Sequence, residues 1–250
     1  MTGRLEGSVA LVTGASSGIG EATALALAAE GASVAVAARR RDRLAALAAR
    51  IDGRALVLET DVTDEAQVVD MVGRTVAELG GLDVLINNAG VMLLGPIEGA
   101  PTEEWRRMVE LNLLGLLYCT HAALPHLLAA AEGPRGVADV VNVSSVAGRV
   151  ARLNNGVYSA TKWGVGAFSE SLRQEVTTRH VRVTLVEPGA VATELSSHNR
   201  PEVRDMIAGN FAGVTRLEAG DIAAAVLFAV TQPRHAAVNE VLIRPTEQER

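Results

Sequence analysis

Short apolar runs alternate with longer stretches of helical periodicity along most of the chain. Seven runs predict strands, and they lie at residues 9–12, 33–37, 55–58, 83–86, 140–143, 181–186 and 238–243. The stretches between them carry apolar residues at helical spacing. They predict helices at about residues 19–30, 41–51, 64–79, 102–130, 157–179 and 218–231. Pro125 predicts a break or kink near the end of the fourth helix.

Strands that are apolar throughout are typical of a parallel sheet that helices cover on both faces. The alternation of strand and helix predicts the same arrangement. We therefore expect an α/β fold in which residues 1–250 form a single, doubly wound domain around a seven-stranded parallel sheet.

Residues 190–217 form the one long segment outside this alternation. The segment is polar and charged, and Pro201 and two glycines interrupt it. In sheets of this kind, ligands bind beyond the carboxyl ends of the strands. We therefore expect a substrate lid here, with a disordered surface loop as the alternative.

Composition and charge exclude several classes of protein. With a net charge of −6, the 250-residue chain lacks the basic surface expected for nucleic-acid binding. The single cysteine, Cys119, excludes a disulfide framework, and five dispersed histidines predict no metal site. No apolar run reaches the ~18 residues of a membrane span, and no secretory signal is found. We expect a cytoplasmic protein without a membrane or nucleic-acid partner.

A glycine-rich loop joins the first predicted strand to the first helix, with the sequence Thr13-Gly14-Ala15-Ser16-Ser17-Gly18-Ile19-Gly20. Glycines at this point allow a tight turn and a close approach of the backbone to a pyrophosphate, which the helix N-terminus attracts. Glycines also end strands and cap helices, but the strand-loop-helix context favours a nucleotide site.

Basic residues follow the second strand. NAD-selective folds of this type carry an acidic residue here, whereas positions 36–39 hold no acid. Guanidinium groups bind the 2′-phosphate of NADP well. Arg39 is therefore the first candidate for that phosphate, Arg40 is the second, and Ser16 is a supporting donor. The alternative is a solvent-exposed basic helix start, which would oppose the helix dipole.

Polar motifs end later strands and open a later helix. They are Asn87-Asn88-Ala89-Gly90, Asn112, Asn142-Val143-Ser144-Ser145 and Tyr158-Ser159-Ala160-Thr161-Lys162. Tyr158 and Lys162 are four residues apart and share one helix face. With the glycine loop and Pro188-Gly189 plus Thr193, these motifs make the chain resemble the short-chain dehydrogenase/reductase family over essentially its whole length. On segments 92–96, 122–128 and 243–246, it looks most similar to NADP-dependent reductases resembling clavulanic acid dehydrogenase.

The resemblance implies a Rossmann fold and hydride transfer between NADP(H) and a small carbonyl or alcohol substrate. Tyr158 would be the acid in reduction and the base in oxidation, and Ser145 would bond the substrate oxygen. Lys162 would hold the nicotinamide ribose, and Asn112 would help hold a water in a proton relay. The free pKa of tyrosine is ~10, and we expect the Lys162 ammonium and a positive nicotinamide to favour the phenolate.

The resemblance also implies cofactor contacts from Gly14, Ser16, Ser17, Gly18, Ile19, Gly20, Arg39, Arg40, Asp61, Val62, Asn88, Ala89, Gly90, Tyr158, Lys162, Pro188, Gly189, Val191 and Thr193. The expected substrate pocket is lined by Met92, Leu93, Leu94, Ser145, Val146, Leu153, Asn154, Tyr158, Val191 and Leu195. Glu187 departs from the asparagine that many members carry before Pro-Gly, which leaves open a shift in the nicotinamide contacts. Substrate contacts by His198, Arg200 and Arg204 also stay open.

Family members of this size commonly form tetramers, so we expect a homotetramer or a dimer. Two other functions stay open. A nucleotide-sensing protein without catalysis is one, and the complete Ser-Tyr-Lys set argues against it. An epimerase or dehydratase on the same scaffold is the other, and the short region after residue 190 leaves little room for the larger nucleotide-linked substrates usual for that class.

Overall fold

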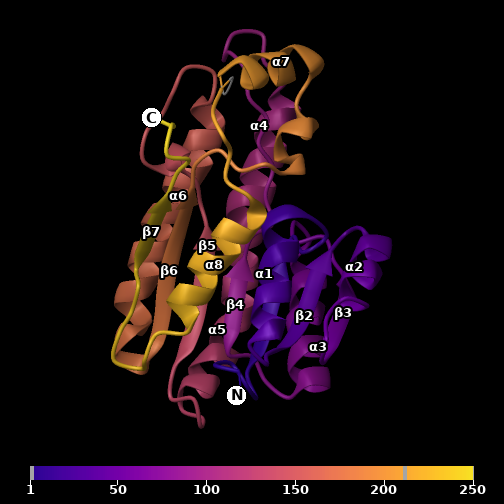
Figure 1. The fold of residues 1–250 in the computed structure, drawn as a ribbon, viewed down its shortest axis with the longest axis vertical. Coiled ribbons are helices and arrows are strands. Elements are labelled where there is room, and N and C mark those ends of the chain that lie inside the picture. The colour runs from indigo at the N-terminus through magenta and orange to yellow at the C-terminus, as the bar shows by residue number, and fades with distance from the viewer. Residues whose placement is uncertain (1–2, 211–212, 250) are drawn as a thin grey trace.

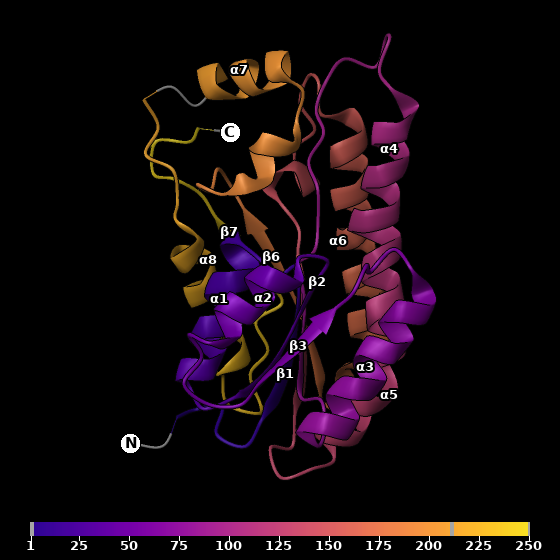
Figure 2. The same cartoon turned by 90° about the vertical axis from the view of Figure 1, so that its right-hand side faces the viewer.

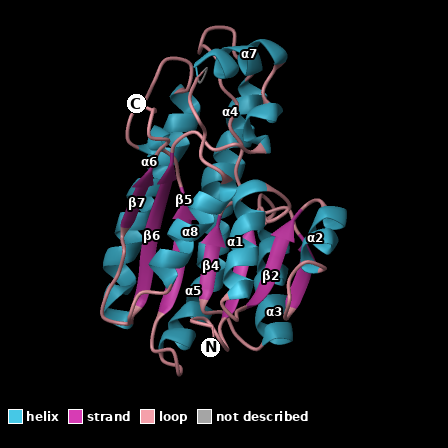
Figure 3. Cartoon of the chain, viewed as in Figure 1, coloured by secondary structure: helices cyan, strands magenta, loops and turns pink. Residues whose placement is uncertain are grey.

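In the part of the chain that the structure describes, seven parallel strands form one sheet, as the sequence predicts (Figure 3). The structure is a computed structural model that describes residues 3–210 and 213–249. The strands are β1 (Val9–Thr13), β2 (Ser33–Ala38), β3 (Ala55–Glu59), β4 (Val84–Asn87), β5 (Ala138–Val143), β6 (Val181–Pro188) and β7 (Glu240–Ile243). Their order across the sheet is β3-β2-β1-β4-β5-β6-β7. The order reverses between β1 and β4, which is the point where ligands bind in sheets of this type.

Helices cover both faces of the sheet (Figure 2). One face carries α1 (Gly18–Ala29), α2 (Arg41–Ala48) and α8 (Ala219–Val230). The other carries α3 (Glu65–Leu79), α5 (Gly115–Ala131) and α6 (Gly156–Val176). Strand β1 shows why two layers are needed, because Leu11 packs into one core while Ala10 and Val12 pack into the other.

The longest predicted helix is continuous but is not regular. It consists of α4 (Thr102–Val109), a π-helical segment η1 (Glu110–Leu114) and α5. Of the break or kink predicted at Pro125, the break does not occur, because Pro125 lies inside α5 and the helix runs on to Ala131. The irregular turn instead surrounds the buried Asn112. A π-helical turn is frequent at functional sites.

The same helix, Thr102–Ala131, is long and apolar enough to cross a membrane by length and composition alone. Core helices of water-soluble proteins pass the same test. Of its most apolar window, 33% is buried within this chain, and Cys119, Ala123 and Leu127 pack into the core under the sheet. The helix therefore belongs to the layer that covers the sheet.

The segment predicted as a lid contains helical structure. It carries η4 (Glu194–His198) and α7 (Pro201–Asn210), while residues 211 and 212 lie outside the described residues. Figure 1 shows α7 beyond the carboxyl ends of the strands, on the side where the site is expected. Shorter 3-10 turns are η2 (Val146–Gly148) and η3 (Thr177–Arg179).

Candidate functional site

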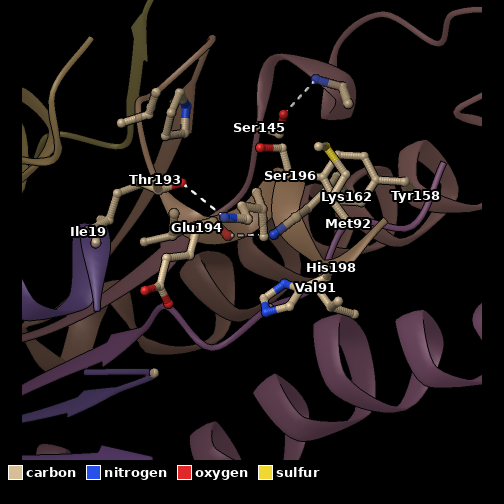
Figure 4. A pocket seen from close by; sticks show the side chains of 18 of the residues that line it. Ile19, Val91, Met92, Ser145, Tyr158, Lys162, Thr193, Glu194, Ser196 and His198 are labelled. Atoms are coloured by element: carbon tan, nitrogen blue, oxygen red, sulfur yellow. Dashed lines mark hydrogen bonds between the residues drawn. The ribbon is translucent and has the colours of Figure 1, made fainter. Parts of the chain in front are cut away.

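A cleft of about 1110 Å³ opens at the carboxyl edge of the sheet. It brings together nearly all of the predicted site residues (Figure 4). Those that line it are Gly14, Ser16, Ser17, Gly18, Ile19, Arg39, Arg40, Asp61, Val62, Asn88, Ala89, Gly90, Met92, Leu94, Ser145, Val146, Leu153, Asn154, Tyr158, Lys162, Pro188, Gly189, Val191, Thr193 and Leu195. Gly20, Leu93 and Asn112 do not line it.

The glycine loop needs glycine for steric reasons. Gly14 and Gly18 have φ angles of 64° and 58°, a region that favours glycine. A Cβ on Gly14 would lie 2.8 Å from the Ala89 Cα, and one on Gly20 would lie 2.5 Å from the Asn88 Nδ2. Gly20 therefore lies beneath the loop and lets it pack against Asn88.

Asn88 and Thr13 fasten the loop to the end of β4. The Asn88 side chain donates from Nδ2 to the carbonyl oxygens of Thr13 at 3.0 Å and of Gly14 at 3.3 Å. The Thr13 hydroxyl accepts from the backbone N–H groups of Asn88 and Ala89. These bonds fix the glycine loop against the end of β4, just before α1 begins. The N-terminus of α1 therefore faces the cleft at a fixed position, and a helix N-terminus attracts phosphate.

Arg40 lies closer to the serines of the glycine loop than Arg39 does. The Arg40 guanidinium donates to the Ser16 hydroxyl at 2.9 and 3.1 Å and to the Ser17 hydroxyl at 2.9 Å. Arg39 is 62% exposed and lies 3.9 Å from the Asp61 carboxylate. Arg40 and Ser16 thus form a ready donor set for a phosphate.

These features fit a dinucleotide phosphate. A Cβ at Gly14 would clash with Ala89 and one at Gly20 would clash with the Gly14 carbonyl oxygen, so the loop requires glycine at both positions, as a loop that approaches a pyrophosphate closely does. A guanidinium and two serine hydroxyls lie together on the nucleotide side of the cleft. No cluster of three or more His, Cys, Asp or Glu side chains within residues 3–210 and 213–249 is arranged to hold a metal ion.

The predicted acid-base residues converge at the other end of the cleft. Tyr158 and Lys162 are both buried on α6, and the Lys162 Nζ lies 5.9 Å from the centroid of the Tyr158 ring. The Lys162 ammonium donates to the Val143 carbonyl oxygen at 2.9 Å. Ser145 follows β5, and its hydroxyl accepts from the Ala147 N–H at 3.1 Å (Figure 4).

Burial dominates the protonation of this pair. It raises the pKa of Tyr158 to about 12, and a hydrogen bond with Ser145 offsets part of the rise. Burial also lowers the pKa of Lys162 to about 8. Desolvation is thus the largest effect on Tyr158 in the protein alone, and the expectation that Lys162 together with a bound, positively charged nicotinamide favours the phenolate stays a prediction.

Asn112 clamps the backbone beside the cleft. Its Oδ1 accepts from the Val91 N–H at 2.7 Å and its Nδ2 donates to the Val91 carbonyl at 2.8 Å. Its amide also donates to the Thr161 hydroxyl at 3.3 Å. Asn112 therefore ties η1 both to the chain after Gly90 and to α6. In this arrangement its side chain is a positioning group.

Ser144 and Ser145 have different environments, as strand alternation predicts. The Ser144 hydroxyl is buried and donates to the Lys162 carbonyl at 3.2 Å. Both serines line the cleft, but the Ser144 hydroxyl is already bonded to the Lys162 carbonyl, which favours Ser145 as the residue that bonds a substrate oxygen.

Glu187 is a buried ion-pair partner. Its side chain is 1% exposed, and the Arg149 Nε donates to both of its carboxylate oxygens at 2.8 Å. Arg149 also contacts Glu240 at the start of β7. Glu187 therefore joins the chain before Pro188 to the turn after Ser145. In the described residues, its carboxylate is bonded to Arg149 and does not line the cleft.

The substrate side of the cleft is mainly apolar, with one correction. Leu93 is buried in a cluster with Met108 and Tyr158, so its prediction as a pocket residue is wrong. Strand-like alternation turns Met92 and Leu94 toward the cleft and Leu93 away from it. Leu153 is 91% exposed at the mouth.

The polar residues of the lid segment differ in position. His198 lines the cleft, and burial together with Arg107 and Arg40 lowers its pKa. Arg200 lies 3.5 Å from both Glu104 and Glu202, outside the cleft. Arg204 is exposed and does not line the cleft.

The sequence analysis missed several residues of the site, and three of them make specific hydrogen bonds there. Asn199 accepts from the Leu94 N–H at 2.7 Å and donates to the Met92 carbonyl at 2.9 Å, which fastens the lid to the substrate side. Gln248 accepts from the Ala190 N–H at 2.9 Å. Glu194 lines the cleft and bonds to Arg40 at 3.0 Å. Each makes contacts distant in sequence, which no local pattern indicates.

Comparison with known proteins agrees with this architecture. The short chain dehydrogenase family matches residues 8–204, and the chain belongs to that family. It is 38% identical to an uncharacterized oxidoreductase of Staphylococcus aureus over 242 residues, which cover 96% of this chain and 98% of the relative. It is 41% identical to the glycine betaine reductase of Emericella nidulans over 98% of this chain, and the match spans 19% of that relative.

Two similar solved structures were determined with an NADP cofactor. The closed form of serine dehydrogenase complexed with NADP+ matches with a TM-score of 0.89 and 32% identity, covering 97% of this chain and 96% of that one. An alcohol dehydrogenase from Thermococcus sibiricus complexed with 5-hydroxy-NADP matches with a TM-score of 0.86 and 28% identity, covering 97% and 98%. The chain is thus an oxidoreductase of the short chain dehydrogenase family, and these two similar structures hold an NADP cofactor. The narrower resemblance to clavulanic acid dehydrogenase is not confirmed by these matches.

Proposed function

We propose that the protein is an NADP(H)-dependent carbonyl reductase or alcohol dehydrogenase that acts on a small molecule. The observation that carries the proposal is the convergence of Ser145, Tyr158 and Lys162 at one end of a cleft whose other end is the glycine loop. When bound, NADP supplies or accepts the hydride at the substrate carbon. The chain's own residues then have to manage a proton at the substrate oxygen.

Tyr158 is proposed as the group that moves this proton. In reduction, its hydroxyl donates a proton to the carbonyl oxygen as the carbon gains hydride; in oxidation, the phenolate accepts that proton back. Its raised pKa keeps the hydroxyl protonated at neutral pH, ready to donate. Ser145 bonds the same oxygen and fixes the carbonyl in place. Lys162 provides a positive charge beside the phenol, and Asn112 positions the backbone that borders both.

The apolar substrate side supports a small substrate with limited charge. Similar proteins include a serine dehydrogenase, an alcohol dehydrogenase and a glycine betaine reductase, so the first substrate panel combines aldehydes, ketones and 3-hydroxy acids. We propose residues 190–217 as the lid over this side, because Leu195, Ser196, His198, Met206 and Ile207 all line the cleft.

The test is NADPH oxidation with carbonyls and NADP+ reduction with alcohols, followed by absorbance. Tyr158→Phe should keep cofactor binding and lose turnover by about 10²-fold or more. Tyr118→Phe is the matched control, because it removes the same hydroxyl from α5 and should keep activity. A fully active Tyr158→Phe variant would refute the mechanism. Cofactor binding without turnover on the whole panel would favour the nucleotide-sensing alternative.

We propose Arg40, ahead of Arg39, as the main ligand of the 2′-phosphate. Arg40→Met should weaken NADP+ binding about tenfold or more and leave NAD+ binding nearly unchanged, since a lost charged hydrogen bond costs about 1.5–3 kcal/mol. Arg39→Met is the matched control, with a smaller effect expected from its exposed position. The reverse order of effects would restore Arg39 as the first candidate.

We also propose a homotetramer or a dimer in the cytoplasm. Large apolar side chains are exposed on α6, α8 and β7, where Trp163, Phe228 and Leu242 are 53%, 55% and 44% exposed. Exposed apolar side chains of this size are typical of subunit interfaces. Light scattering of the purified protein tests the assembly, and a monomer at micromolar concentration would contradict it.

A further inference from the structure

Glu194, the first residue of the lid turn η4, is bound by two arginines of the nucleotide side. Its Oε2 accepts from the Arg40 Nη1 at 3.0 Å. The Arg43 Nη1 donates to its Oε1 at 2.7 Å and to its Oε2 at 2.9 Å. These partners lie more than 150 residues away in the sequence, so the contact links the lid directly to the start of α2.

Arg40 has all three guanidinium nitrogens engaged. Nε and Nη2 contact the Ser16 and Ser17 hydroxyls, while Nη1 contacts Glu194. Figure 4 shows the Glu194 carboxylate on the Ile19 side of the cleft, away from Tyr158 and Lys162. The lid carboxylate therefore lies at the nucleotide end of the cleft, beside the donor set that fits a phosphate.

A 2′-phosphate and the Glu194 carboxylate carry charge of the same sign. The arginines hold the pKa of Glu194 down to about 2, so the carboxylate is ionised at neutral pH. A dianionic phosphate that reached Arg40 and Ser16 would be repelled by Glu194 and would compete with it for the guanidinium. NAD, which has a hydroxyl at this position, would meet no such competition.

The turn that carries Glu194 is seated on the glycine loop. Thr193 precedes it and caps η4 with its hydroxyl. A Cβ on Gly18 would lie 3.1 Å from the Thr193 Cγ2, so the two segments are in close contact. Movement of Glu194 away from Arg40 and Arg43 would therefore shift the first turn of the lid relative to the glycine loop.

We propose that Glu194 competes with the 2′-phosphate of NADP for Arg40 and Arg43, so that binding of the phosphate releases the lid turn Glu194–His198. This inference rests on the proposed nucleotide site. It means that NADP, which carries the 2′-phosphate, releases the lid turn, whereas NAD does not. A ligand shifts a conformational equilibrium only through contacts that differ between the two states, and the contested guanidinium is such a contact. The ion pair is half-exposed, with side chains 40–45% accessible, so it is exchangeable.

The direct test is cofactor binding to Glu194→Gln, which keeps the shape and removes the charge. We expect NADP+ and 2′,5′-ADP to bind about three- to tenfold more tightly, and NAD+ to change less than about twofold. High salt should reduce the gain, because exposed charges are screened. Glu202→Gln is the matched control: it neutralises another lid acid that is not bonded to Arg40 or Arg43, and it should change neither affinity.

Hydrogen exchange of the peptide containing residues 194–198 gives a second readout that does not depend on turnover. NADP+ should speed exchange in the wild-type protein and NAD+ should not, while Glu194→Gln should exchange fast without either. Weaker NADP+ binding by Glu194→Gln, or equal changes for NADP+ and NAD+, would overturn the competition. If the wild-type protein bound neither cofactor, the proposed function would fail as well; normal NADP+ binding with no effect of Glu194→Gln overturns this inference alone.

Discussion

Replacing Arg149 with methionine would leave the Glu187 carboxylate buried without its ion-pair partner. Glu187 is 1% exposed, and Arg149 donates three charge-assisted hydrogen bonds to it, two from Nε at 2.8 Å and one from Nη2 at 2.5 Å. Removing one partner of a buried pair costs about 3–5 kcal/mol. Arg149 itself is 38% exposed, so water can reach the vacated side and reduce the cost. We expect a loss of about 2–3 kcal/mol in the free energy of unfolding.

The assay is equilibrium urea unfolding at fixed protomer concentration, because assembly changes apparent stability. The loss corresponds to a fall in Tm of about 4–12 °C for a chain of this size. Arg74→Met is the matched control: it breaks the Arg74–Glu78 pair, in which both side chains are 46% exposed, and should cost no more than about 0.5 kcal/mol.

A double-mutant cycle separates the pair from the loss of side-chain packing. Arg149→Met combined with Glu187→Leu should be more stable than Arg149→Met alone, because the unpaired buried charge is removed with its partner. If Arg149→Met and Arg74→Met lowered the free energy of unfolding equally, the buried Glu187 carboxylate would not need Arg149 as its ion-pair partner, and the reasoning would be refuted.

Two further predictions concern the cleft. Lys162→Met should abolish turnover yet raise stability at pH ~7 by about 1–3 kcal/mol, because the folded protein no longer holds a buried ammonium whose pKa is lowered to about 8. Between about pH 8 and the ordinary pKa of 10.5, the unfolded wild-type chain binds more protons than the folded one, so wild-type stability should rise with pH and the extra stability of Lys162→Met should fade. Urea unfolding at several pH values measures this difference in stability. A difference that stays constant with pH would contradict the prediction. Gly20→Ala should lower stability by about 1–3 kcal/mol and impair NADP+ binding, since its Cβ would lie 2.5 Å from the Gly14 carbonyl oxygen. Gly73→Ala in α3, with open space around the new Cβ, should be neutral or slightly stabilising, and equal effects of the two substitutions would argue against the steric reason.

The sequence predicts the sheet well because a strand buried on both faces must be apolar. It errs where a buried strand contains a charge. β6 extends through Glu187 to Pro188, beyond the apolar run that ends at Val186, because Arg149 neutralises the carboxylate. β5 begins at Ala138, before the predicted start, because Asp139 is buried against Arg182 at 2.7 Å. Glu187 is 38 residues from Arg149 and Asp139 is 43 residues from Arg182, so no local pattern indicates these two pairs. Asp139 is also paired with Arg135, four residues before it, at 2.7 Å.

The site shows the same division. Motif order and spacing predict which residues gather at the carboxyl edge, because each parallel strand ends at that edge. They do not predict which of two adjacent arginines meets Ser16, since this depends on where α2 begins. They also do not predict that the side-chain amide of Asn112 accepts from the Val91 N–H and donates to the Val91 carbonyl, because this geometry requires the π-helical turn.

The two glutamates on either side of the Pro188–Thr193 segment hold it in different ways. Glu187 ties its beginning to the turn after Ser145 through a buried pair, where breaking the contact would leave an unpaired charge. Glu194 ties its end to Arg40 and Arg43 through exposed pairs, which exchange at little cost. The segment is thus fixed next to the proposed catalytic groups and releasable next to the proposed phosphate site. A buried pair at both ends would leave the lid unable to respond to the cofactor, and exposed pairs at both ends would leave the geometry around Ser145 poorly defined.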